Sequence, residues 1–135
     1  MTTILLSKMS VHSSGTLAKY ISFIFLLLFV VVNLHSQASC DEIRRYVQTT
    51  DFGITYSSYN SDAITKVSFH QITDESYNTL YFAIVQFKSS YTEYIYQVDS
   101  NTQLSYSINY TSSAGEAFWD YIHPYRQVLG CAPDL

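Results

Sequence analysis

The sequence contains few charged residues, and basic residues are the scarcer kind. Only 13% of its 135 residues are charged, with seven Lys and Arg against eleven Asp and Glu. The resulting net charge of -4 argues against the basic surface that proteins use to bind nucleic-acid phosphates. With four Gly and two Pro, the chain also lacks a collagen-like or low-complexity composition. An apolar content of 47% argues against intrinsic disorder.

Motifs of catalysis and metal binding are also missing from the sequence. It has no Gly-rich phosphate loop, no G-x-S-x-G motif, no paired-cysteine zinc spacing and no calcium-binding loop. Of its four His, only His70 and His123 lie beyond residue 38. We expect His70 to be solvated where a strand runs into a polar loop, and His123, beside Pro124, to cap or pack against a helix end. The spacing suggests one weak acid–base pair, His70 with Asp74, and we predict no enzyme activity, no metal site and no cofactor.

An apolar run near the N-terminus has the features of an export signal. Residues 21–32 read ISFIFLLLFVVV, two lysines precede this run, and the small residues Ser36 and Ala38 follow it. A positive segment, a short apolar core and a small-x-small exit predict a secretory signal peptide over residues 1–38, cleaved after Ala38. The alternative is a retained membrane anchor, but a spanning helix needs about 20 apolar residues.

Removal of this segment changes the composition of what remains. Without the first 38 of its 135 residues, the chain keeps 97, with five Lys and Arg against all eleven Asp and Glu, a net charge of -6. It also keeps twelve of the thirteen Tyr. A domain of this size holds one modest hydrophobic core, so a covalent cross-link would stabilise it usefully.

Two cysteines, Cys40 and Cys131, lie near the ends of this predicted mature chain. An even number of cysteines in an exported protein predicts a disulfide, and closing a loop of this length stabilises a protein by about 4.5 kcal/mol. The alternatives are free thiols or a lipidated Cys40, which would attach the protein to a membrane. Gln37 disfavours lipidation, because it stands where such signals have Leu or a similar residue.

Hydrophobic periodicity predicts one helix, then strands, then further helices. The expected elements are a helix at 39–48, an edge strand within 51–60, strands at 63–72, 79–87 and 91–98, and helices that begin near 100 and 113. This order describes an α+β fold, in which a small antiparallel β-meander of three to four strands packs against C-terminal helices, with a short N-terminal helix in addition.

Finer expectations concern the faces and caps of these elements. Three Ser residues at capping-box spacing should begin the helices, namely Ser39, Ser100 and Ser113. Leu104 and Ile108 should share one face of the helix that begins near 100. Alternation should place four residues of the strand at 63–72 on one of its faces: Ala63, Thr65, Val67 and Phe69.

Residues 60–126 resemble the KTSC domain, a small module first named from the C-terminus of certain lysyl-tRNA synthetases. Ser61 through Phe69 looks like the opening strand of that family. Tyr94, Tyr96 and Val98 are similar to its central Tyr-x-Tyr with a trailing Val, and the spacing of Ser113, Gly115, Phe118 and Ile122 is similar to its closing motif. The resemblance leaves residues 39–59 as an N-terminal helix and extension, and residues 127–135 as a tail that carries the second Cys.

The resemblance implies a fold more than a function. The KTSC family has no established activity; RNA binding has been suggested for it, and the family commonly has Lys where this sequence has Ala114. Export and the net charge of -6 disfavour RNA binding here. For Tyr94 and Tyr96 the resemblance implies a structural role.

The abundance of Tyr favours a binding surface, because Tyr combines a large contact area with a polar tip. Four Tyr could border the helical side of the domain and form this surface: Tyr106, Tyr110, Tyr121 and Tyr125. The first hypothesis is therefore an exported, non-catalytic interaction domain that recognises a protein or a cell-surface glycan. The alternative is a disulfide-stapled structural or accessory domain whose Tyr are mostly internal.

Overall fold

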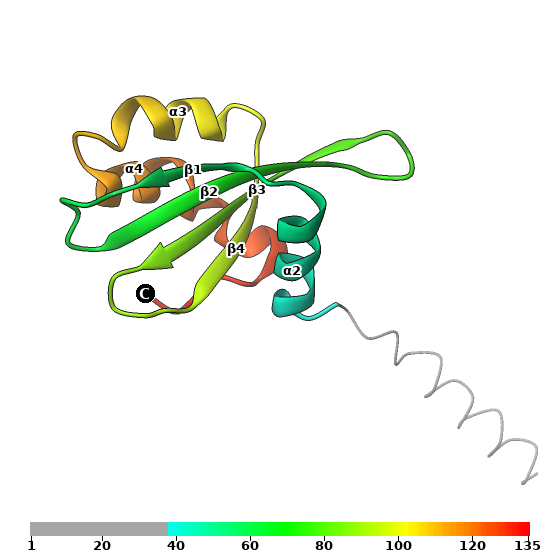
Figure 1. Ribbon diagram of the computed structural model, residues 1–135, viewed down its shortest axis with the longest axis horizontal. Coiled ribbons are helices and arrows are strands. Elements are labelled where there is room, and N and C mark those ends of the chain that lie inside the picture. Colours follow the sequence, from blue (N-terminus) through cyan, green and yellow to red (C-terminus); the bar gives the residue numbers. More distant parts are fainter. Residues whose placement is uncertain (1–37) are drawn as a thin grey trace, which may run out of the picture. The chain divides into compact units, whose positions relative to one another are not determined.

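The computed structural model describes residues 38–135, which form one compact unit. Residues 1–37 of the predicted signal peptide lie outside the described residues. The sheet contains four antiparallel strands in the order β1-β2-β3-β4 (Figure 1), so the α+β prediction is confirmed. In chain order the elements are α2 (Cys40–Thr50), β1 (Ile54–Ser57), β2 (Ile64–Thr73), β3 (Thr79–Phe87), β4 (Glu93–Val98), α3 (Thr102–Asn109), α4 (Ala114–Tyr121), the 3-10 turn η1 (His123–Tyr125) and α5 (Arg126–Leu129).

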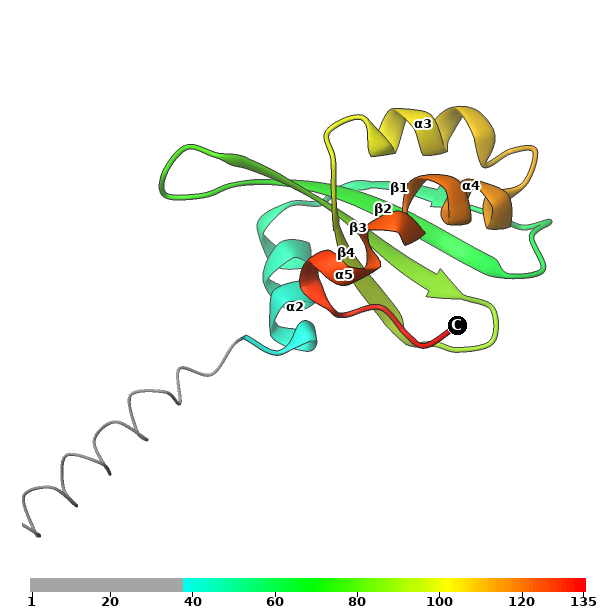
Figure 2. The same cartoon turned by 180° about the vertical axis from the view of Figure 1, so that it is seen from behind.

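Helices cover both faces of the sheet. On one face α3 and α4 bury the larger part of the core, to which Tyr106 and Phe118 contribute the largest helical side chains. On the other face Val47 of α2 packs with a smaller cluster that includes Cys131. Figures 1 and 2 show the same arrangement from opposite sides, with α2 and α5 beside β4.

β3 lies in the middle of both clusters. Phe82 and Ile84 point into the α2 cluster, whereas Ala83, Val85 and Phe87 point into the α3/α4 cluster. The side chains of β3 therefore alternate between the two clusters, and both faces of this strand are covered. Three residues of β4 also share the α3/α4 face: Tyr94, Tyr96 and Val98.

The alternation predicted for β2 is wrong at its beginning. Ala63 and Thr65 are exposed, whereas Ile64 is buried in the same cluster as Val67. The pairing with β3 shifts register between Ile64 and Lys66. A bulge of this kind inserts one extra residue and re-aims the side chains that precede it.

The helix starts agree only in part with the predicted capping boxes. Ser39 and Glu42 form the complete reciprocal box, and the Ser113 hydroxyl accepts the Glu116 N–H at 3.2 Å. At α3 no box forms, because Asn101 occupies the cap position and its side chain makes no capping bond. The face that α3 presents to the core carries Tyr106, so Leu104 and Ile108 lie together on the exposed face.

The predicted disulfide joins the first turn of α2 to the C-terminal segment. Cys40 and Cys131 are bonded, with their Cα atoms 5.6 Å apart. The sulfur of Cys40 is thus engaged, which overturns the lipidated and free-thiol alternatives. A disulfide agrees with an extracellular or periplasmic location. Within residues 38–135, none of the helices has the length and apolarity needed to cross a membrane.

Candidate functional site

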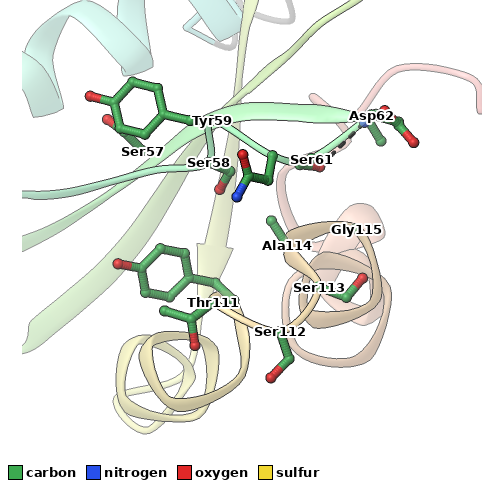
Figure 3. Close-up of a pocket in the computed structure, with 13 residues that line it drawn as sticks. Ser57, Ser58, Tyr59, Ser61, Asp62, Thr111, Ser112, Ser113, Ala114 and Gly115 are labelled. Atoms are coloured by element: carbon green, nitrogen blue, oxygen red, sulfur yellow. Dashed lines mark hydrogen bonds between the residues drawn. The ribbon is translucent and has the colours of Figure 1, made fainter.

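A polar hollow separates the β1–β2 loop from the α3–α4 loop (Figure 3). Its cavity volume is about 460 Å³, within the range of about 300–1,000 Å³ of small-molecule sites. We call it the Ser/Tyr hollow, because eight of its thirteen lining residues carry a hydroxyl group. The lining residues are Ser57, Ser58, Tyr59, Asn60, Ser61, Asp62, Ala63, Tyr110, Thr111, Ser112, Ser113, Ala114 and Gly115.

Local hydrogen bonds hold the β1–β2 side of the hollow. The Ser58 N–H donates to the Thr65 carbonyl at 2.9 Å, which extends the β1–β2 pairing by one residue. The Ser61 hydroxyl accepts the N–H groups of Ala63 and Ile64 at 3.3 and 3.0 Å. Ser turns of this type satisfy the backbone without a regular element, so the loop has a defined shape.

The opposite side of the hollow is the N-terminus of α4. Ser113 caps this helix, and its first two N–H groups belong to Ala114 and Gly115. Such groups have no partner within a helix, and no other described residue accepts a hydrogen bond from them. A side chain added at Gly115 would lie 3.9 Å from the Ala63 Cβ, so the helix start and the β1–β2 loop approach closely here.

Tyr110 forms an aromatic wall of the hollow and is held from behind. Its ring stacks on Tyr106, with centroids 5.7 Å apart and an interplanar angle of 14°. Tyr56 contacts it edge-on at 5.1 Å. Because Tyr106 belongs to the core, the orientation of the Tyr110 ring is fixed before any ligand arrives.

Two hydroxyl groups beneath the hollow are left without partners. Ser58 is 8% exposed, and Figure 3 shows its side chain directed from the β1–β2 loop toward the α3–α4 loop. Neither Ser58 Oγ nor Tyr106 Oη has a hydrogen-bond partner among residues 38–135. Burial raises the pKa of Tyr106 to about 12, and the nearby Ser58 hydroxyl opposes this rise. The geometry of the two hydroxyls nevertheless does not meet that of a hydrogen bond, so capacity for one remains here.

The charge of the hollow is negative. Asp62 supplies the single carboxylate of the lining, and no lining residue among those described is Lys, Arg or His. Glu116 follows in the first turn of α4. Helix N-termini commonly attract anions, but here two carboxylates oppose such binding.

A smaller apolar pocket of about 230 Å³ adjoins the Ser/Tyr hollow. The two cavities share Asp62, Ala63 and Gly115. The wall of the apolar pocket includes Trp119, which is 51% exposed. The Trp119 ring rests on His123, with centroids 4.1 Å apart, and desolvation and then the Arg126 charge lower the pKa of His123. The packing role predicted for His123 fits this contact.

The predicted Tyr surface does not form as a unit. Tyr106 is fully buried, and it cannot contribute to a surface. Tyr121 and Tyr125 are half-buried against the core, with hydroxyls bonded to Asn109 and Asp99. Of these four Tyr, Tyr110 alone lines the hollow, because helix packing decides on which side each Tyr lies.

Sequence reasoning missed the Tyr that is most available at this site. Tyr59 is 89% exposed and lines the hollow. Within residues 38–135, the other exposed Tyr lie elsewhere, in α2, in the β2–β3 turn and in the β3–β4 turn: Tyr46, Tyr77 and Tyr91. A run without charge over residues 52–61 was the signal that could have marked the loop, since loops carry function.

His70 is buried, contrary to the solvated role predicted for it. Its Nδ1 lies 2.9 Å from the Asp51 carbonyl oxygen and its Nε2 lies 3.1 Å from the Ser68 hydroxyl. The Asp51 carboxylate is 3.9 Å from Nδ1 and accepts the Gln71 N–H instead. These contacts fasten the α2–β1 connection to β2, and neither Ser68 nor His70 lines the Ser/Tyr hollow.

Two of the residues behind the KTSC resemblance lie where β4 meets α4, whereas its opening stretch, Ser61 through Phe69, leads into β2. Tyr96 and Phe118 meet edge-on at 5.8 Å, and Ile122 is fully buried beside them. Ser113 and Gly115 serve the α4 start described above. Comparison with protein-family models, with curated proteins and with solved structures finds no match for this chain.

Proposed function

We propose that this chain is an exported, non-catalytic binding domain that holds its ligand in the Ser/Tyr hollow. The observation that carries the proposal is the pairing of this preformed hollow with unused hydrogen-bonding groups at both of its walls. Ser58 offers a buried hydroxyl on one side, and Ala114 and Gly115 offer free N–H groups on the other. Buried polar groups without partners are rare in folded proteins and favour a ligand that supplies them.

Export is supported by the disulfide and by the sequence of residues 1–38. The proposal includes cleavage after Ala38, an exposed position next to the start of α2. It also includes kinship with the KTSC domain over residues 60–126, supported by the residue pattern and by the packing of Phe118 on Tyr96. The proposal does not include RNA binding, because the hollow is acidic, whereas binding of RNA phosphates needs Lys and Arg side chains.

A disulfide-stapled accessory domain without a ligand is the second candidate. The placement of Tyr favours it, since eight of the twelve Tyr beyond residue 38 are buried or half-buried. The aromatic excess would then stabilise a small core and its margins.

Two measurements on the exported protein separate these candidates. Intact mass should give a chain that begins at Ser39 and is two hydrogens lighter than its reduced form. A photo-crosslinking amino acid at position 59 should give an adduct in the exported fraction, whereas the same group at position 91 should not. Tyr91 is the matched control, because it is equally exposed but lies outside the hollow. Retention of residues 1–38, or the absence of an adduct at position 59, would contradict the proposal.

A further inference from the structure

We infer that the ligand of the Ser/Tyr hollow is a neutral oligosaccharide, without carboxylate, sulfate or phosphate groups. The inference rests on the proposed function and adds the chemical class of the ligand. Three properties of the site carry it: its charge, its hydrogen-bonding groups and the presence of aromatic rings in both adjoining cavities.

The charge of the site excludes acidic ligands. Asp62 belongs to the lining and Glu116 lies in the adjacent helical turn. Recognition of an anion would need Lys or Arg to offset these carboxylates, and the described residues of the lining include neither. The Asp62 carboxylate, by contrast, readily accepts hydrogen bonds from neutral hydroxyl groups.

The hydrogen-bonding groups suit a ligand with many hydroxyls. A sugar hydroxyl both donates and accepts, as the Ser, Thr and Tyr hydroxyls of the lining do. The N–H groups of Ala114 and Gly115 can only donate, and the Asp62 carboxylate can only accept. A ligand that carries both functions on each group satisfies all of them, whereas an apolar ligand would leave the Ser58 hydroxyl unpaired, which is costly.

The aromatic rings give the site an extended form. Tyr59 and Tyr110 line the hollow, and Trp119 lines the pocket on the far side of the Ala63–Gly115 contact. A Tyr or Trp ring offers an apolar face and a polar edge, which matches a sugar ring with its apolar face and peripheral hydroxyls. Because rings stand in both cavities, we expect a chain of several sugars rather than a single one.

The experiment is a titration of the protein, with its disulfide intact, against uncharged oligosaccharides. The probes are hexamers of β-1,4-glucose, β-1,3-glucose, xylose and mannose, with an oligogalacturonate of equal length as the acidic probe. Backbone amide NMR should show shifts at Ala114 and Gly115 for at least one neutral hexamer and none for the acidic one. Trp119 is the single Trp of the chain, so a change in its fluorescence should accompany binding of the hexamer and be absent for the monosaccharide.

Matched variants locate the binding. Tyr59→Ala should weaken the affinity for the hexamer about tenfold, a loss of about 1.4 kcal/mol in binding free energy, whereas Tyr91→Ala should leave the affinity unchanged. Both side chains are almost fully exposed, at 89% and 97%, so neither variant should unfold the protein. Ser58→Ala should also weaken binding while the melting temperature stays the same or rises, because it removes an unpaired hydroxyl.

Three results would overturn the inference. They are no amide shift with any neutral hexamer at millimolar concentration, equal binding of the acidic probe, or equal losses in Tyr59→Ala and Tyr91→Ala. If position 59 crosslinks to a protein while no hexamer binds, the glycan inference fails and the proposed binding function stands. If position 59 gives no adduct and no hexamer binds, both fail.

Discussion

Lys66 Nζ lies 2.9 Å from Glu93 Oε1, although the strands of these two residues are separated by β3. The register explains this reach, since Lys66 pairs with Gln86 and Gln86 pairs with Glu93. The other carboxylate oxygen accepts from Gln48 at 2.9 Å and from Arg44 at 3.4 Å. One carboxylate of β4 therefore joins α2 to β2 across the intervening strand β3.

Replacement of Glu93 should weaken this connection between α2 and the sheet and destabilise the protein. Glu93→Gln keeps the size of the side chain but leaves Lys66 without its counter-charge and Arg44 with Asp41 alone, which should lower the free energy of unfolding by about 1–2 kcal/mol. Chemical denaturation measures the loss. Glu75→Gln is the control, because Glu75 is exposed and forms no ion pair among the described residues.

The same variant should respond differently to acid. Burial alone would raise the pKa of Glu93, but the hydrogen bonds from Lys66 and Gln48 and the charges of Lys66 and Arg44 lower it below 4.5. The folded state thus favours the carboxylate, and this stabilisation is present above pH 4.5 and lost as the pH falls through the lowered value. A wild-type protein and a Glu93→Gln variant with equal acid sensitivity would contradict the assignment.

Removal of the two core Tyr hydroxyls should not destabilise the protein. Tyr96 Oη and Tyr106 Oη are buried without partners among residues 38–135, so Tyr96→Phe and Tyr106→Phe should leave stability unchanged or raise it by up to about 1 kcal/mol. Tyr125→Phe is the matched control, since its hydroxyl donates to Asp99 at 2.7 Å, and it should cost about 1 kcal/mol. Thermal unfolding separates these outcomes.

The two hydroxyls should also govern alkaline stability. Desolvation raises the pKa of both Tyr96 and Tyr106 from 10.0 to about 12. The neutral phenol is favoured in the folded state, so its contribution is complete below pH 10.0 and disappears as the pH rises toward 12. The double Phe variant should lose less stability than the wild type over this interval. Equal losses would show that these two groups do not control alkaline unfolding.

Replacement of Tyr77 in the β2–β3 turn should increase the stability of the protein. It adopts φ 63°, the single positive φ among the described non-glycine residues, and such a conformation costs a bulky side chain about 1 kcal/mol. Tyr77→Asn should therefore stabilise the protein by about 0.5–1 kcal/mol, because Asn tolerates this region. Tyr91→Asn, in a turn without positive φ, should give no gain. A melting temperature of Tyr77→Asn below that of the wild type would contradict the claim that the backbone is strained at Tyr77.

Loss of the disulfide should be the largest single effect on stability. Cys40 and Cys131 are 91 residues apart in the sequence, and closing such a loop stabilises by about 4.5 kcal/mol in the chain-entropy account. The Cys40→Ser/Cys131→Ser variant should unfold at much lower denaturant and become insensitive to reductant. A wild-type protein whose unfolding is unchanged by reductant would refute this role.

The features that were predicted from sequence are those that depend on neighbouring residues. β3 begins and ends at the predicted residues, because its alternation and its flanking turns are local. The Ser39 box likewise needs only the spacing to Glu42. The disulfide is the exception: it joins residues 91 apart in the sequence, and it was predicted from the even number of cysteines and the expectation of export.

The features that escaped prediction depend on tertiary contacts. The bulge before Lys66 arises from pairing with β3, and α3 turns Tyr106 inward because the aromatic cluster of Tyr56 and Phe69 receives it. His70 is buried because Gly53 comes so close that a Cβ there would lie 2.6 Å from the imidazole. The Ser/Tyr hollow lies between two loops that are about fifty residues apart in the chain. Hydrophobic periodicity describes neighbouring residues and cannot predict that such distant loops meet.

The N-cap of α2 would change chemically if the peptide bond after Ala38 were hydrolysed. The Ser39 nitrogen now donates to Glu42 Oε2 at 2.7 Å, and this contact and the Ser39 hydroxyl lower the pKa of Glu42. Hydrolysis would turn that nitrogen into an ammonium group, since the pKa of an α-amino group is about 8. A positive charge opposes the helix dipole at this end, but its counter-ion already stands in place. Maturation would thereby convert a capping hydrogen bond into an ion pair without moving a residue.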